Sequence, residues 1–212
     1  MIFKICGLKN KESLLCCEEN NADFFGMIFY EKSPRNITFD EARILISASK
    51  KMRIRPVGVF VDHEIHDLKK IISSLDLKHI QLHGNEDEKF CKELSSFCNV
   101  IKAFRIDDTF DLNDIEKYSK YCKYFLFDTF TESYGGSGKK FNWDLLLNYD
   151  HKKDFILSGG INLELISSIK KLKNQLPNLI GVDLNSKFEI KPGLKDINRV
   201  KKFIKSIKNE NT

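Results

Sequence analysis

A pattern of eight repeated units is the feature of this 212-residue sequence that most constrains its fold. In each unit, a short run rich in β-branched and aromatic residues precedes a longer segment whose apolar residues recur at helical spacing. This pattern is typical of strand-then-helix units in a parallel α/β protein. The predicted strands cover residues 2–6, 23–30, 56–62, 79–83, 99–106, 124–128, 154–159 and 179–184. The predicted helices cover residues 10–20, 39–52, 64–75, 86–97, 112–121, 142–149, 162–174 and 194–208.

The number of units favours a closed barrel over an open doubly wound sheet, which rarely needs eight of them. No long linker, proline-rich spacer or block of like charge interrupts the alternation. The length also suits one hydrophobic core. We therefore expect an α/β fold, a single-domain (β/α)₈ TIM barrel over residues 1–212.

Polar residues at the ends of the predicted strands are the first candidates for a functional site. Strands that are buried on both faces are nearly continuously apolar, and the active site of such a barrel lies at the carboxyl ends of its strands. The polar residues found there are Cys6, Tyr30, Asp62, His83, Arg105, Asp128, Ser158 and Asp183.

Two glycine-bearing loops follow the last two strands, at 158–162 and 183–193. Loops in these positions usually bind phosphate, and Gly159 and Gly160 allow the backbone to approach an anion closely. Paired glycines can also simply make a tight turn.

Strands six and one flank this pair of strands in a closed barrel, so Asp128 and Cys6 at their ends face a phosphate-anchored sugar from opposite sides. A carboxyl group and a thiol so placed form a plausible acid and base. The alternatives are a buried cysteine that fills space and a carboxylate that caps a loop. An ordinary thiol is also mostly protonated at neutral pH, so Cys6 needs a local field to act as a base.

Two further segments have alternative interpretations. The glycine-rich loop 135–144 is either a flexible lid over the site or a simple connection. Arg35, in the loop after strand two, either holds a carboxylate through its planar guanidinium group or lies on the surface.

Composition excludes several classes of protein. The net charge is +5, but lysines alternate with acidic residues and no basic groove with interleaved aromatic residues is present, so we expect no nucleic-acid partner. No apolar run approaches the roughly 20 residues that cross a bilayer, so we expect no membrane partner. The six cysteines show no metal-ligand spacing, which predicts reduced thiols in a cytoplasmic protein.

Eight motifs together resemble the phosphoribosylanthranilate isomerase family in order and spacing. They are KICGL at 4–8, GMIFYEKSPRNI at 26–37, VGVFVD at 57–62, IQLHGNED at 80–87, IKAFRI at 101–106, FDT with GGSGKKFNW at 127–143, LSGGIN at 157–162 and GVDLNSKFEIKPGLKD at 181–196. The resemblance implies an Amadori rearrangement of a phosphosugar in tryptophan biosynthesis, without metal or organic cofactor. It leaves monomer or homodimer open.

The resemblance also implies roles for individual residues. Asp128 protonates the furanose oxygen, Cys6 removes the C2′ proton, and Arg35 holds the anthranilate end of the substrate. The residues implied to bind phosphate are Gly159, Gly160, Asn185 and Ser186, and those implied to line the pocket are Gln81, His83 and Asp183. For His83, a tuning or packing role is as plausible as direct catalysis.

One position departs from the family pattern. Family members often have Ser-Ser-Gly or Asn-Ser-Arg before the acidic residue of this loop, whereas here Lys187 follows Asn185 and Ser186. Lysine is strained at this position if the backbone requires a positive φ; it could instead add charge near the phosphate.

Three other functions compete with the isomerase. A phosphosugar epimerase of this fold is expected to carry metal-ligating His and Asp residues at several strand ends, and a synthase to use Lys and Glu there. A non-catalytic barrel is expected to lack Cys6 or Asp128, and both are present.

Overall fold

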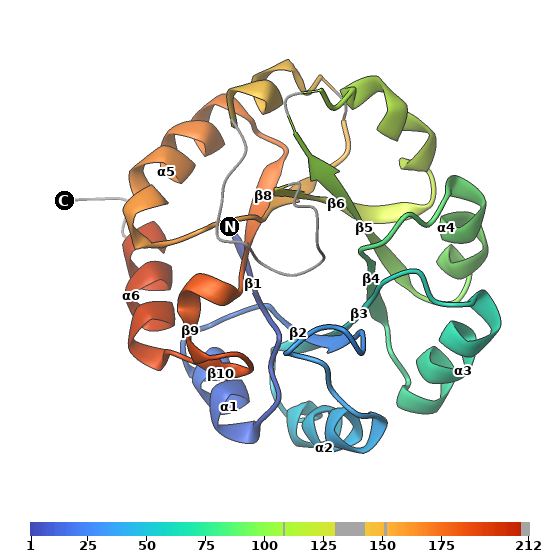
Figure 1. Cartoon of the computed structure of the whole chain (residues 1–212). Coiled ribbons are helices and arrows are strands. Elements are labelled where there is room, and N and C mark those ends of the chain that lie inside the picture. Colours follow the sequence, from blue (N-terminus) through green and yellow to red (C-terminus); the bar gives the residue numbers. More distant parts are fainter. Residues whose placement is uncertain (108, 130–142, 151, 209–212) are drawn as a thin grey trace.

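Eight parallel strands close into a barrel in the computed structural model, which describes residues 1–107, 109–129, 143–150 and 152–208. The strands are β1 (Ile2–Cys6), β2 (Phe24–Phe29), β3 (Arg55–Phe60), β4 (His79–Leu82), β5 (Asn99–Ile106), β6 (Cys122–Thr129), β7 (Phe155–Leu157) and β8 (Leu179–Leu184). Each pairs with the next in sequence, and β1 also pairs with β8. The predicted TIM barrel is therefore confirmed, with strand bounds that differ from the expected ones by a few residues (Figure 1).

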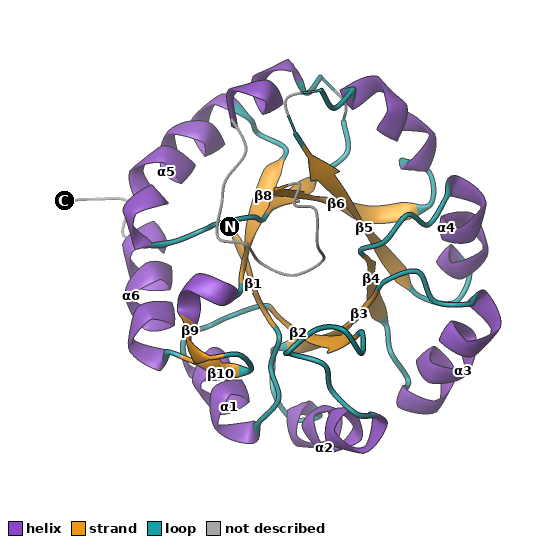
Figure 2. Cartoon of the chain, viewed as in Figure 1, coloured by secondary structure: helices purple, strands orange, loops and turns teal. Residues whose placement is uncertain are grey.

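Helices surround the barrel on its outside, as Figure 2 shows. They are α1 (Lys11–Glu19), α2 (Phe39–Ser49), α3 (Ile65–Leu75), α4 (Glu88–Ser95), α5 (Ile166–Gln175) and α6 (Ile197–Lys208). The first and last of them, α1 and α6, pack against each other on the outside of the barrel, where β1 and β8 close it (Figure 1).

Two of the predicted helices are shorter and of a different kind. After β5 and β6 the chain forms 3₁₀ segments, η1 (Leu112–Tyr118) and η2 (Trp143–Asn148), in place of α-helices. Apolar spacing alone does not distinguish three residues per turn from 3.6 over so short a segment.

The last predicted helix begins three residues late. Leu194–Lys195 forms a strand, β10, that pairs antiparallel with β9 (Glu189–Lys191). This small hairpin follows another 3₁₀ segment, η4 (Ser186–Phe188), and it was not predicted because two- and three-residue strands carry no periodic signal.

Local capping explains where several helices begin. The Thr38 hydroxyl accepts from the Glu41 amide, and the Glu41 carboxylate accepts from the Thr38 amide, which fixes the first turn of α2. Asn162 caps η3 (Leu163–Leu165), the 3₁₀ turn that leads into α5. These contacts satisfy first-turn amides that have no partner inside the helix.

The apolar side chains form two separate clusters, one outside and one inside the barrel, because successive residues of a strand point to opposite faces. The larger cluster lies between the strands and the helices. The smaller one fills the interior of the barrel and includes Cys6, Val57, Ile101, Leu126 and Ile156. Residues of the same parity further along these strands therefore point into the barrel at its carboxyl end.

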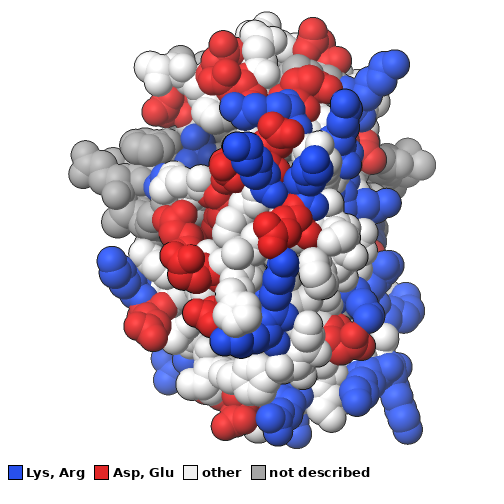
Figure 3. All heavy atoms as spheres, turned by 90° about the vertical axis from the view of Figure 1, so that its right-hand side faces the viewer, with Lys and Arg blue, Asp and Glu red and all other residues white. Residues whose placement is uncertain are grey.

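Positive and negative side chains are mixed on the face of the molecule that carries α3 and α4, where lysine and arginine are interspersed with aspartate and glutamate (Figure 3). Among the described residues, no helix is both long and apolar enough to cross a membrane.

Candidate active site

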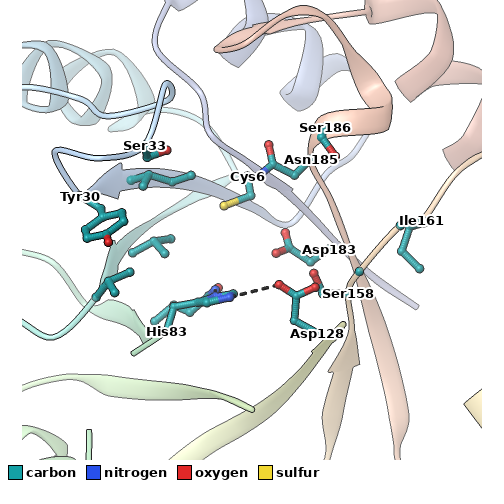
Figure 4. A pocket seen from close by; sticks show the side chains of 16 residues that line it. Cys6, Tyr30, Ser33, His83, Asp128, Ser158, Ile161, Asp183, Asn185 and Ser186 are labelled. Carbon is teal, nitrogen blue, oxygen red and sulfur yellow. Dashed lines mark hydrogen bonds and ion pairs between the residues drawn. The ribbon is translucent and has the colours of Figure 1, made fainter. Parts of the chain in front are cut away.

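A pocket lies at the carboxyl ends of the strands and brings most of the predicted site residues together. Its empty volume is about 740 Å³, part of it open to solvent. The lining residues are Cys6, Ile28, Tyr30, Ser33, Val59, Val61, Gln81, His83, Asp128, Ser158, Gly159, Gly160, Ile161, Asp183, Asn185 and Ser186. Figure 4 shows the side chains of Cys6, Asp128 and Asp183 gathered around the same space.

Three of the sequence candidates lie elsewhere. Asp62 accepts hydrogen bonds from Asn85, and Arg105 donates to the Asn85 side chain, so both contact the loop after β4 rather than the pocket. Arg35 is buried beside the pocket but is not part of its lining.

Cys6 ends β1 with its sulfur packed against β2. A Cβ built on Gly26, its partner in the strand register, would lie 2.7 Å from the Cys6 Sγ, so only glycine leaves room for the sulfur. Burial raises the pKa of the Cys6 thiol, while the positive charge of Lys4 acts against that shift.

Asp128 and His83 form a contact across the pocket. The Nε2 atom of His83 is 3.1 Å from Oδ2 of Asp128, and Oδ1 of Asp128 accepts from the Thr129 amide. On its other side, Nδ1 of His83 is 2.6 Å from Nε2 of Gln81. Gln81, His83 and Asp128 therefore form a chain that ends on the Asp128 carboxyl group.

The loops after β7 and β8 form the wall of the pocket next to Asp128. Gly159 and Gly160 have φ values of 81° and 63°, a region that side chains disfavour. A Cβ on Gly159 would also lie 2.9 Å from Oδ1 of Asp128. The two glycines thus bring bare backbone close to Asp128, and Asn185 and Ser186 of the loop after β8 line the same pocket.

Lys187 adopts no positive φ, so the departure from the family pattern carries no backbone strain. It lies within η4, and its carbonyl accepts a hydrogen bond from Arg199.

Arg35 is held by a buried carboxylate. Its Nε and one terminal nitrogen bind Glu189 at distances of 2.7–3.1 Å. Lys195 binds the same carboxylate at 2.8 Å and the Asn185 side chain at 3.0 Å. Although burial alone raises the pKa of Glu189, the hydrogen bonds from Arg35 and the charge of Lys195 hold it below its ordinary value. The hairpin therefore ties the loop after β2 to the loop after β8.

Sequence reasoning missed three charged residues near the site: Lys4, Glu189 and Lys195. Lys4 is fully buried and binds both carboxylate oxygens of Asp183, at 2.9 and 3.0 Å. A usable signal existed for it, because a lysine in the apolar strand IFKIC, two residues before Cys6, shares the inward face with that cysteine.

Two further points concern the predicted lid and metal binding. The predicted lid, 135–144, lies outside the described residues up to position 142. Within the described ranges, no cluster of three or more His, Cys, Asp or Glu side chains is arranged to hold a metal ion.

Comparison with known proteins identifies the family. Residues 3–206 match the family model of N-(5'phosphoribosyl)anthranilate (PRA) isomerase. The chain is 38% identical to an N-(5'-phosphoribosyl)anthranilate isomerase of Parabacteroides distasonis over 208 residues, 98% of this chain and 93% of that protein.

Solved structures agree with the sequence match. The monomeric form generated from the dimeric Thermotoga maritima enzyme superposes with a TM-score of 0.82 at 31% identity, covering 99% of this chain and 100% of that one. A PRA isomerase in complex with reduced 1-(o-carboxyphenylamino)-1-deoxyribulose 5-phosphate gives a TM-score of 0.83 at 32% identity, covering 98% and 99%. With the barrel, the pocket and a match over nearly its whole length, this chain belongs to the N-(5'-phosphoribosyl)anthranilate isomerase family.

Proposed function

We propose that Asp128 and Cys6 are the acid and the base of the reaction that defines this family. As a member, the chain is an isomerase of tryptophan biosynthesis that converts N-(5-phosphoribosyl)anthranilate to 1-(2-carboxyphenylamino)-1-deoxyribulose 5-phosphate. The observation that carries the proposal is that both side chains line one pocket together with the loops after β7 and β8.

Asp128 acts first. Its protonated carboxyl group gives a proton to the furanose oxygen, the bond from that oxygen to C1′ breaks, and the nitrogen lone pair forms a protonated imine. His83 holds Oδ2 of Asp128 and so orients the acid.

Cys6 acts second. Its thiolate takes the proton from C2′, an S–H bond forms, and the C–H electron pair moves into a new C1′–C2′ double bond while the imine nitrogen becomes neutral. The resulting enolamine then tautomerises to the ketone. The protonated imine makes the C2′ proton acidic enough for a thiolate to remove.

The remaining contacts orient the substrate. Backbone around Gly159 and Gly160, with Asn185 and Ser186, binds the phosphate. Asp183 and Gln81 line the pocket beneath the sugar. Arg35 holds the anthranilate carboxylate through the end of its guanidinium fork, because Glu189 occupies the edge formed by Nε and one terminal nitrogen.

The two proposed reacting groups, Cys6 and Asp128, and the proposed phosphate-binding residues all line one pocket within a single chain. We therefore propose that a second copy is not required for chemistry, even though the T. maritima enzyme is dimeric. Activity per chain should stay constant when the enzyme is diluted through any dimer dissociation that light scattering detects.

All six cysteines are free thiols. This supports a reducing compartment, and we propose that the protein is cytoplasmic.

The direct test is to add the purified protein to freshly made phosphoribosylanthranilate and follow the loss of anthranilate-type fluorescence. The rate should exceed spontaneous hydrolysis, and no acceleration would contradict the assignment. Cyanoborohydride then separates the two roles. Cys6→Ala should still accumulate the open imine, which the reagent traps as a reduced amine, whereas Asp128→Ala should trap no more than the uncatalysed reaction.

A further inference from the structure

Lys4 is a charged residue that the proposed reaction does not use. It lies in the middle of β1 with no exposed surface, and it faces the barrel interior. Its register partner on β8 is Asp183, and the two side chains form an ion pair of 2.9 Å in which both groups are almost fully buried. A buried ion pair gains little stability over apolar residues of similar volume, so stability is a weak explanation for its presence.

After binding Asp183, the ammonium group of Lys4 has one N–H donor left for Cys6. An ammonium group has three N–H donors, and Asp183 accepts through its two oxygens. Lys4 and Cys6 lie two residues apart on the same face of β1, about 6.6 Å along the strand. The Lys4 side chain is long enough to cover that distance, so the third N–H of its ammonium group can reach the Cys6 sulfur.

The charges around Cys6 come from several elements. Lys4 from β1 and Asp183 from β8 lie nearest, and Lys195 from β10 adds a positive charge that Glu189 neutralises. His83 and Asp128 face Cys6 across the pocket, and on the β2 side Gly26 contributes no charge. Burial raises the pKa of the thiol, and Lys4 is the largest influence that lowers it.

We propose that Lys4 is a positioning residue that makes Cys6 available as a base: its ammonium group, anchored by Asp183, donates a hydrogen bond to the thiolate in the barrel interior. This inference rests on the proposed role of Cys6. When the thiolate takes the C2′ proton, the S–H bond replaces this hydrogen bond, and the Lys4–Asp183 pair is left neutral. Asp183 keeps the buried ammonium group charged, and it holds the pKa of Lys4 above its ordinary value despite burial.

The test compares the parent protein with the double variant Lys4→Met with Asp183→Asn, which removes both charges and so leaves no unpaired buried anion. Two quantities are measured against pH: kcat/KM, and the thiolate absorbance near 240 nm after subtraction of the same protein carrying Cys6→Ser.

In the double variant, the acidic limb of kcat/KM and the thiolate midpoint should both lie about one pH unit or more above those of the parent protein. Activity at neutral pH then falls by about 10-fold or more and recovers at higher pH. A loss of kcat/KM that is uniform across pH, with an unmoved thiolate midpoint, would show a merely structural role and overturn the proposal.

A second variant serves if the Lys4→Met double variant does not fold. Lys4→Gln with Asp183→Asn keeps a hydrogen-bond donor of similar length without the charge, and the same upward shift is expected. The two readouts also separate this inference from the proposed function. A thiolate midpoint that shifts while the kcat/KM limb stays fixed supports the Lys4–Cys6 coupling and contradicts Cys6 as the base. A thiolate midpoint that does not move contradicts the coupling itself.

Discussion

The imidazole of His83 connects Asp128 to Gln81: its Nε2 lies 3.1 Å from Oδ2 of Asp128, and its Nδ1 lies 2.6 Å from the Gln81 amide nitrogen. When that amide donates to Nδ1, the ring proton is on Nε2 and faces Asp128. When Asp128 is protonated, its O–H group donates a hydrogen bond to Nε2. The ring proton is then on Nδ1, which needs the side-chain oxygen of Gln81 as its acceptor. That oxygen is buried and has no hydrogen-bond partner among the described residues, so the amide loses no bond by turning.

This relationship predicts a positioning role for both residues. His83→Ala and Gln81→Leu should each lower kcat by roughly 10-fold, below the range of about 10²–10⁴ for a direct acid or base. Because both act through one chain of contacts, the double variant should be no slower than His83→Ala alone. Effects that multiply in the steady-state kinetics would show that Gln81 acts independently of His83.

Removal of either reacting group should have the largest effect. Cys6→Ala and Asp128→Ala are each expected to reduce turnover by about 10²–10⁴-fold while the circular dichroism spectrum and the unfolding midpoint stay close to those of the parent protein. Cys98→Ala, at a half-buried thiol on the outside of the barrel, is the matched control and should keep full activity. Near-normal turnover in either variant would remove that residue from the mechanism.

Glycine at position 26 should be required for the position of the Cys6 sulfur. Gly26→Ala puts a methyl group 2.7 Å from Sγ, so the sulfur must move, and kcat should fall by about 10-fold or more. Gly181→Ala is the matched control, because its methyl group would lie 2.8 Å from Ile2 at the other end of β1. Both variants should lose roughly 1–3 kcal/mol in urea unfolding, but only Gly26→Ala should lose turnover; equal kinetic losses would mean that barrel strain, rather than the sulfur position, is responsible.

Arg35 should act on substrate binding through the shape of its side chain. Arg35→Lys keeps the charge but loses the planar fork that binds Glu189 and a carboxylate at the same time. We expect KM for phosphoribosylanthranilate to rise about 10-fold with a smaller change in kcat. Arg53→Lys, at an exposed surface pair with Glu18, should leave both constants unchanged.

Glu189 should stabilise the protein in a pH-dependent way. Its pKa is lowered in the folded state relative to the ordinary value of 4.5, so its contribution is complete above that value and is lost as the pH falls through the lower folded pKa. Glu189→Gln leaves Arg35 and Lys195 without their anion and should cost roughly 3–5 kcal/mol near pH 7.

The difference between Glu189→Gln and the parent protein should shrink as the pH falls through the lowered folded pKa of Glu189, below which the carboxyl group is neutral in both states. Denaturant unfolding across an acidic pH series measures it. Glu93→Gln, which breaks the exposed pair with Lys69, is the control and should cost less than about 1 kcal/mol. A difference for Glu189→Gln that is independent of pH would mean that the packing of this side chain, and not its charge, stabilises the hairpin.

The sequence by itself determined the barrel and most of the pocket. Alternation between strand and helix is a local pattern, and eight such units leave few other folds. Since the carboxyl ends of parallel strands meet at one face, Cys6, His83 and Asp128 could be assigned to one site from their positions at strand ends. Because side chains alternate between the two faces of a strand, the sequence also indicated which residues point into the barrel.

Only the tertiary structure decided which charges meet. Barrel closure places β1 beside β8, so Lys4 meets a carboxylate 179 positions away in the sequence. The short hairpin after β8 brings Glu189 onto Arg35 over a separation of 154 positions. Neither contact produces a local sequence pattern, because the partner that makes a buried lysine or glutamate tolerable lies on another element far away in the chain. The field at Cys6 is therefore a property of the closed barrel rather than of the strand that carries it.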